Sequence, residues 1–111
     1  MTGPAIRRGD VWWVAFDPSV GGEIQKTRPA VIVSNNDANR AQNRVQVVPL
    51  TSRQTAVRSW EARIVLAGQF KKALADQIKT VAKERMRGRM GSVSADELDA
   101  IERAIKIQLA L

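Results

Sequence analysis

The chain of 111 residues contains no cysteine, no histidine and no tyrosine. Without cysteine it can form neither a disulfide framework nor a thiolate metal site. Without histidine it lacks the most common zinc ligand and the usual acid–base side chain near neutral pH. Any catalytic site must therefore use carboxylates, lysine, arginine, hydroxyl groups and the backbone.

Acidic residues are also scarce, with 11 Asp and Glu against 18 Lys and Arg, which gives a net charge of +7. A surplus of this size on a small chain favours a polyanionic partner, and nucleic acid comes ahead of an anionic membrane or an acidic protein. The alternative is a basic surface that serves solubility alone.

Long apolar segments are missing as well. No run approaches the ~20 apolar residues that span a bilayer, and the N-terminal residues lack the apolar core of a signal peptide. Apolar residues still make up 44% of the chain, enough for a modest core. We expect a single cytoplasmic domain over residues 1–111, with no membrane association.

Short apolar segments separated by glycine, proline and polar clusters predict several strands. The expected strands cover residues 9–16, 29–34, 44–50, 62–66 and 76–82, with a brief one near Met90. Residues 35–42 can hold one helical turn, and residues 68–73 are expected to form a turn.

The clearest helix is at the C-terminal end. Ser94 and Glu97 have the spacing of a capping box, in which each side chain binds a backbone amide of the other. Apolar side chains then recur at helical spacing, so one face is expected to dock on the sheet. They are Leu98, Ile101, Ile105 and Leu109. The pattern predicts a mainly β fold, a small bent sheet or partly open barrel with a C-terminal helix.

The first expected strand is apolar on both faces, so both should be covered, one by the core and the other by a loop or a partner subunit. Core packing is the preferred interpretation of Trp12 and Trp13 over base stacking. Trp60 is expected to cover part of the core, with base stacking as the alternative.

A glycine-rich polar segment, residues 21–28, leads into the second expected strand. It places Glu23 and Arg28 at the edge of a rigid sheet, and Pro29 restricts the backbone of Arg28 to extended conformations. A guanidinium held there offers two parallel donors to a phosphate. A surface ion pair is the alternative for Arg28. For Glu23 the alternatives are contacts to loop amides or a pair with Arg28.

A second polar cluster follows the third expected strand. Thr51 and Ser52 stand at its end, and residues 53–63 form a basic loop that is expected to be mobile. The hydroxyl of Thr51 can add a donor to a bound phosphate, and the alternative is an ordinary hydroxyl at a strand end.

These motifs, in this order, resemble the MazF/PemK family of toxin ribonucleases along nearly the whole chain. The segments that carry the resemblance are Gly9-Asp10-Val11-Trp12, Gly22-Glu23 with Arg28-Pro29-Ala30-Val31, Pro49-Leu50-Thr51-Ser52, Ala75-Asp76-Gln77-Ile78-Lys79-Thr80 and the closing helix. The resemblance implies a small SH3-like β-barrel of the CcdB/PemK type with a C-terminal helix. It also implies a homodimer with RNA bound across it.

The family resemblance further implies a sequence-specific endoribonuclease that cuts single-stranded RNA (mRNA, or else tRNA or rRNA) without metal or another cofactor. Attack by the 2′-OH would leave a 2′,3′-cyclic phosphate and a 5′-OH. A cognate acidic antitoxin would neutralise the toxin.

Carried over by matching positions, the catalytic residues fall on Arg28, Thr51 and Glu23. RNA contacts are expected at Gly22, Gln25, Lys26, Ser52, Arg53 and Gln77. The chain departs from the family where many members have Gly-Ser-Glu-Gln, because it has Gly22-Glu23-Ile24-Gln25 preceded by a second glycine. That loop helps to select bases, so the cleavage sequence does not carry over.

Two points stay open at this stage. The general base can be Glu23, although an exposed carboxylate is a weak base, or Arg28, although arginine is almost always protonated. The function can also be that of a gyrase-poisoning toxin of the same fold or of a non-cleaving RNA-binding module. The gyrase alternative is disfavoured because residues 107–111 lack the tryptophan by which that group grips gyrase.

Overall fold

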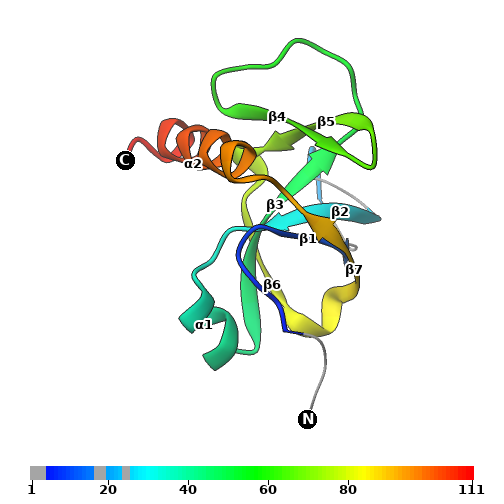
Figure 1. Ribbon diagram of the computed structural model, residues 1–111, viewed down its shortest axis with the longest axis vertical. Helices are drawn as coiled ribbons and strands as arrows, with labels where there is room; N and C mark the ends of the chain where they lie inside the picture. The colour runs from blue at the N-terminus through cyan, green and yellow to red at the C-terminus, as the bar shows by residue number, and fades with distance from the viewer. Residues whose placement is uncertain (1–4, 17–19, 24–25) are drawn as a thin grey trace.

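A single strongly bent sheet dominates the computed structural model, which describes residues 5–16, 20–23 and 26–111 (Figure 1). The sheet has seven strands in the order β4-β5-β3-β2-β1-β7, with β6 also paired to β3. The strands are β1 (Asp10–Ala15), β2 (Thr27–Ile32), β3 (Arg44–Thr51), β4 (Glu61–Leu66), β5 (Gln69–Leu74), β6 (Lys79–Ala82) and β7 (Met86–Ser92). The remaining elements described are α1 (Asn36–Ala41), α2 (Ala95–Leu109) and the 3₁₀ turns η1 (Ala75–Gln77) and η2 (Lys83–Arg85).

The central strands β1, β2 and β3 contribute to two hydrophobic cores, because alternate side chains leave opposite faces of the sheet. One core contains Val11, Val31 and Val48 and is covered by Ile101 of α2. The second contains side chains of the other parity, including Val14 and Val47. The mainly β half-barrel with a C-terminal helix is thus confirmed.

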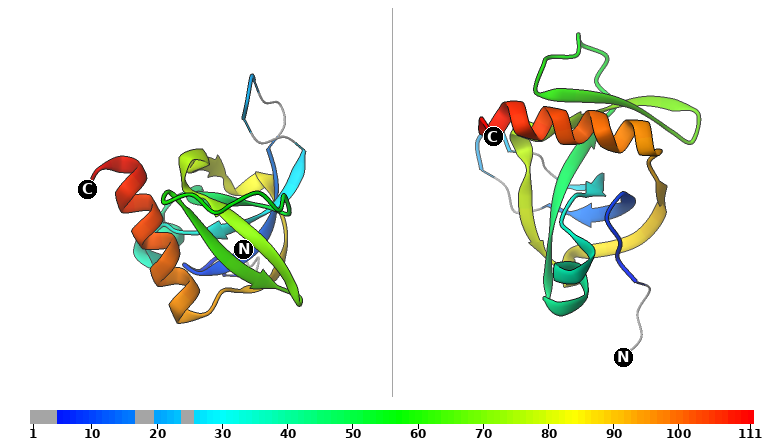
Figure 2. Two further views of the ribbon diagram at one scale, coloured as in Figure 1. Left: turned by 90° about the horizontal axis from the view of Figure 1, so that it is seen from above. Right: turned by 60° about the vertical axis from the view of Figure 1, so that its left-hand side comes forward.

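Helix α2 begins as its sequence predicts. The Ser94 hydroxyl accepts from the Glu97 amide at 3.1 Å, and Glu97 accepts from the Ser94 amide at 2.9 Å. Ile101 is fully buried, but the expected docking of Leu109 is wrong, since this side chain is 48% exposed. The C-terminal end of α2 extends past the sheet (Figure 2), so its last turn has little to pack against.

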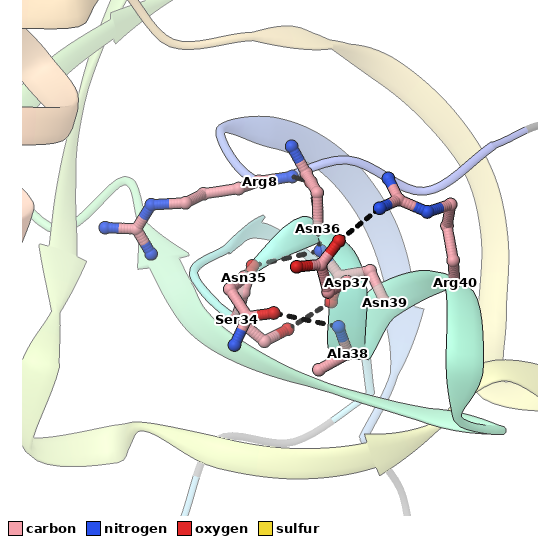
Figure 3. A network of polar contacts seen from close by, with 8 residues as sticks. All are labelled: Arg8, Ser34, Asn35, Asn36, Asp37, Ala38, Asn39 and Arg40. Atoms are coloured by element: carbon pink, nitrogen blue, oxygen red, sulfur yellow. Dashed lines mark hydrogen bonds and ion pairs between the residues drawn. The ribbon is translucent and has the colours of Figure 1, made fainter.

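A polar network joins the N-terminal segment to α1 (Figure 3). The Asn35 side chain caps α1 by accepting from the Ala38 amide at 2.8 Å, and the Arg8 amide donates to Asn36 Oδ1 at 2.8 Å. Buried Asn39 donates to the Ser34 carbonyl at 2.9 Å and accepts from its hydroxyl. These contacts satisfy the polar groups of the one helical turn that the sequence predicts.

The turn expected over residues 68–73 is wrong, because most of that segment is strand β5. The reversal takes only Ala67 and Gly68, whose φ angles are +51° and +78°, the left-handed pair typical of a two-residue hairpin. Residues from Gln69 onward are then free to pair with β4, and Ala73 also pairs with Leu50 of β3.

Several strand boundaries differ from the prediction. The first part of segment 76–82 is the turn η1, and only Lys79–Ala82 is a strand. Strand β2 starts at Thr27, so Pro29 lies inside it, at a point where only β1 pairs and the β3 ladder has not yet begun. The missing amide of proline therefore costs no bond to β3. Strand β7 begins at Met86, earlier than expected.

The two adjacent tryptophans have different environments. Trp12 is 5% exposed and packs in the second core, as predicted. The core position expected for Trp13 is wrong, since 40% of it is exposed. Trp13 lies opposite Pro29 on one side and Gly88 on the other, and neither neighbour has a long side chain to cover an indole.

Candidate active site

A polar cleft of about 780 Å³ opens where β2 and β3 extend beyond the second core. One wall comes from the segment before β2, the other from the loop between β3 and β4, which arches away from the body opposite the N-terminus (Figure 1). The lining residues are Gly22, Glu23, Lys26, Arg28, Thr51, Arg53, Thr55, Ala56, Arg58, Glu61, Lys72, Leu74 and Gln77.

Strand register explains why Arg28 and Thr51 lie in the same cleft. In the antiparallel ladder of β2 and β3, Ala30 is opposite Pro49. Arg28 and Thr51 each lie two residues beyond this pair, on adjacent strands and with the same facing. Arg28 is exposed and Thr51 is half-buried. The strands thus carry buried apolar side chains along the core and then polar side chains into the cleft.

The hydroxyl of Thr51 is oriented by the chain that follows it. Its Oγ1 accepts from the Arg53 amide at 3.2 Å. Because a hydroxyl both accepts and donates, this contact leaves the Thr51 hydrogen to be donated to a ligand. The same turn brings Arg53 to the cleft.

The loop before β2 is held by two contacts. Glu23 Oε1 accepts from the Val20 amide at 2.6 Å, so the carboxylate satisfies a loop amide, one of the alternatives foreseen for it. Gln77 Nε2 donates to the Gly22 carbonyl at 3.1 Å, which ties the loop to η1 across 55 residues of sequence. Lys26 has a φ of +64°, which turns the chain into β2.

A buried ion pair lies at the base of the second wall. Lys72 Nζ is 3.3 Å from Glu61 Oε1, and the two side chains are only 8% and 10% exposed. Lys72 also donates to Thr55 Oγ1 at 2.6 Å and to the Ala56 carbonyl at 3.4 Å. The sequence reasoning missed this pair because it treated Lys72 as part of a turn. The available signal was the opposite charge of Glu61 and Lys72, which can pair across two neighbouring strands.

The cleft attracts anions. Five cationic side chains (Lys26, Arg28, Arg53, Arg58 and Lys72) line it against the two carboxylates Glu23 and Glu61. In the part of the chain that the structure describes, no three acidic, histidine or cysteine side chains converge as a metal site. The arrangement can therefore hold a phosphate by arginine and hydroxyl donors.

The structure brings together seven of the nine residues predicted for the site. They are Gly22, Glu23, Lys26, Arg28, Thr51, Arg53 and Gln77. Ser52 is exposed just beyond β3, next to Thr51, and is not among the residues that line the cleft, so its RNA contact stays a prediction. Its carbonyl accepts from Gln54 instead. Gln25 lies outside the described residues.

A family model described as "PemK-like, MazF-like toxin of type II toxin-antitoxin system" matches residues 7–109. The chain belongs to this family. The MazF-like chain is 38% identical to the endoribonuclease MazF9 of Mycobacterium tuberculosis, over 96% of its own length and 98% of the relative's. It is also 38% identical to the endoribonuclease toxin MazF of Escherichia coli, over 89% of each chain. These identities make it an endoribonuclease toxin.

Solved structures agree with the fold of this MazF-like toxin. MazF from Deinococcus radiodurans superposes with a TM-score of 0.86 at 23% identity, over 98% of this chain and 100% of the other. A mycobacterial endoribonuclease, solved in complex with its cognate antitoxin, superposes with a TM-score of 0.81 at 25% identity, over 96% and 97%. Within the described residues, no helix is both long enough and apolar enough to span a membrane.

Proposed function

We propose that this MazF-like toxin cuts single-stranded RNA, at a preferred short sequence in mRNA, tRNA or rRNA, without a metal ion. The 2′-oxygen forms a bond to the adjacent phosphorus while the bond from phosphorus to the 5′-oxygen breaks. The products are a 2′,3′-cyclic phosphate and a 5′-OH. The observation that carries the proposal is the convergence of Arg28 and Thr51 from adjacent strands on one basic cleft.

Arg28 and Thr51 act on the phosphoryl oxygens, where negative charge increases in the transition state. Arg28 supplies two parallel charged donors, and the Thr51 hydroxyl, held by the Arg53 amide, supplies another. Donors fixed before the reaction need no reorganisation as charge develops, which lowers the barrier.

The proton of the 2′-OH must pass to a base, and the 5′-oxygen takes up a proton from water as it leaves. Two carboxylates line the cleft, but Glu61 is only 10% exposed, is paired with the Lys72 ammonium and accepts from the Arg58 amide. Glu23 is exposed and uses one oxygen to accept from Val20. We therefore assign proton acceptance to Glu23. A general base commonly contributes ~10²–10⁴-fold to a rate, and an exposed carboxylate lies at the weak end of that range.

Exposed cations on both walls of the cleft bind the RNA backbone on either side of the cut. Lys26 and Arg53 are exposed cations on opposite walls, and Gln77 holds the Gly22 loop in place. The predicted contacts of Gln25 and Ser52 belong to the same proposal. A basic groove of this kind follows the backbone of a single strand, and its affinity falls with salt.

We also propose that a cognate acidic antitoxin neutralises the toxin in the cytoplasm by occupying this cleft. The net charge of +7 and the five cations of the cleft support an acidic partner. The mycobacterial relative solved in complex with its cognate antitoxin supports an antitoxin as that partner. A homodimer is supported by the indole of Trp13, 40% exposed on a strand with apolar side chains on both faces.

The test is cleavage of a mixed RNA pool by purified protein in the presence of EDTA. We expect cuts at a recurring short sequence, with cyclic phosphate and 5′-OH ends. Loss of cleavage in EDTA would exclude the metal-free reaction, binding without cuts would indicate an RNA-binding module, and inhibition of gyrase would indicate a gyrase poison.

A modified substrate tests the nucleophile. Replacing the ribose on the 5′ side of the mapped cut with deoxyribose removes the 2′-OH and nothing else. Cleavage at that position should stop while binding is retained. Continued cutting there would refute attack by the 2′-OH.

A further inference from the structure

The buried Lys72–Glu61 pair lies beneath the loop of residues 52–60, which forms one wall of the cleft. The three contacts of the Lys72 ammonium, to Thr55, Ala56 and Glu61, all fall on that loop or at its end. An ammonium has three donors, and these contacts account for them. Lys72 therefore ties β5 to the loop and does not itself point a spare donor at a ligand.

Glu61, which is held by Lys72, in turn holds the backbone of Arg58. The same oxygen, Oε1, that faces Lys72 also accepts from the Arg58 amide at 2.9 Å. In the other direction, the Glu61 amide donates to the Arg58 carbonyl at 2.9 Å. The backbone of Arg58 is thus fixed at both its amide and its carbonyl, through a carboxylate whose own position depends on Lys72.

The Arg58 side chain is also restrained. Its guanidinium lies 5.6 Å from the centre of the Trp60 ring, a cation–π contact that holds one face of the planar group. Its N–H donors lie along the edge of that plane, and Arg58 lines the cleft. A guanidinium restrained on one face and open at its edge suits a phosphate oxygen better than a base.

We propose that the Lys72–Glu61 pair is a latch that positions Arg58 to bind the phosphate of a nucleotide next to the one that is cut. Arg58 contacts the RNA, and Lys72 and Glu61 are positioning residues that act through it. The proposal rests on the proposed function in that it takes the cleft of Arg28 and Thr51 to be the RNA site.

Burial supports a positioning role over a contribution to stability. Two charges taken out of water lose solvation that their attraction often fails to recover, so apolar pairs of similar size are frequently as stable. The two side chains are only 8% and 10% exposed and lie directly under a ligand-binding wall, so a role in fixing the geometry of that wall explains the pair better than a contribution to stability.

The first test measures RNA affinity after Lys72→Met. The RNA carries deoxyribose 5′ of the mapped cut, so that binding is measured without cleavage by fluorescence anisotropy. We expect the dissociation constant to rise about tenfold, equivalent to ~1.4 kcal/mol, while the single-turnover cleavage rate at saturating enzyme stays within about threefold. Lys71→Met is the matched control, because it removes the same charge from the same strand at a residue outside the cleft, and it should leave affinity unchanged.

A second variant tests the latch even if Lys72→Met does not fold. Lys72→Met alone leaves the Glu61 charge buried without its partner, which is strongly destabilising. In Lys72→Met/Glu61→Met both charges are replaced, stability is retained and the latch is still absent. We expect the double variant to be folded and to show the same rise in dissociation constant. Normal affinity in this folded variant would overturn the proposal.

A double-mutant cycle with Arg58→Ala separates the latch from a general effect. Arg58→Ala alone should weaken binding about tenfold. If Lys72 acts through Arg58, adding Lys72→Met/Glu61→Met to Arg58→Ala should change affinity by less than about twofold. Two independent tenfold losses would show that the pair does not act through Arg58.

The same titration distinguishes failure of the latch from failure of the proposed function. If wild-type protein binds RNA without cutting it, the proposed reaction is refuted, and the variants still test the latch with unmodified RNA. If wild-type protein cuts RNA and the latch variants bind normally, only the latch is refuted. If wild-type protein does not bind RNA, both are refuted.

Discussion

Replacing Arg28 with alanine should abolish most cleavage while leaving the fold intact. Arg28 lies at the start of β2, before the strand enters the core, and its side chain is exposed. Exposed substitutions usually change the free energy of unfolding by less than about 0.5 kcal/mol. The midpoint of thermal unfolding should therefore move by no more than about 4 °C.

The expected loss of rate follows from the role of the guanidinium. Removing one preorganised donor from an oxyanion site costs ~10²–10³-fold, equivalent to ~2.7–4 kcal/mol. We expect a loss in this range for the single-turnover rate of Arg28→Ala. Arg28→Lys keeps the charge but not the two parallel donors, so its rate should fall between those of Arg28→Ala and the wild type.

The assay uses an RNA that contains the mapped cut, with enzyme in excess so that differences in affinity do not enter the rate. Arg63→Ala is the matched control, because Arg63 is an exposed strand arginine stacked on Phe70 and outside the cleft. It loses the same charge and should cut normally. A rate for folded Arg28→Ala within about threefold of the wild type would refute our account of the site.

Three other predictions concern the hydroxyl, the charge of the cleft and the C-terminal helix. Thr51→Val should slow single-turnover cleavage by ~10–100-fold because a donor to the phosphate is lost. Thr51→Ser keeps a hydroxyl and should retain most of the rate. Equal losses of rate in both variants would argue against a catalytic role for the hydroxyl. The four exposed cations of the cleft are Lys26, Arg28, Arg53 and Arg58. At ~0.7 per single-strand phosphate, they should give a slope of log affinity against log salt near −2.8. A slope near zero in an anisotropy titration from about 50 to 200 mM salt would contradict a backbone-binding cleft. Ser94→Ala removes the cap of α2 and should lower the free energy of unfolding by ~1 kcal/mol, measured by denaturant unfolding, without changing the cleavage rate. An unchanged unfolding midpoint would show that the cap does not stabilise the protein.

Local patterns explain which parts of the fold could be predicted. The alternation around Val14, the β-branched run of β3 and the capping box at Ser94 are each specified by neighbours in sequence, and each produced the element expected. Arg28 and Thr51 were identified from motifs at strand ends, and the register of two strands places them in one cleft.

The features that were missed depend on neighbours from other parts of the chain. Lysines are unfavourable in strands as a rule, so the segment that contains Lys71 and Lys72 was not predicted to form β5. Lys72 is accommodated there because Glu61 of β4 and the loop before it satisfy its charge. The exposure of Trp13 is likewise set by Gly88 of β7 and Pro29 of β2, and a single-strand pattern carries no information about either.

The position of the central strands between two cores has a consequence for how the molecule unfolds. Strands β1 to β3 contribute buried side chains to both cores, so amide hydrogens of buried residues such as Val31 and Val47 should exchange with solvent only on global unfolding. The β4–β5 hairpin is joined to β3 by only two register pairs, Leu50 with Ala73 and Thr51 with Lys72. The inner face of the hairpin also packs in the first core, through Ala62, Ile64 and Ala73. The RNA-binding wall should therefore be lost together with that core, and heat or denaturant should abolish cleavage at the same midpoint as folding.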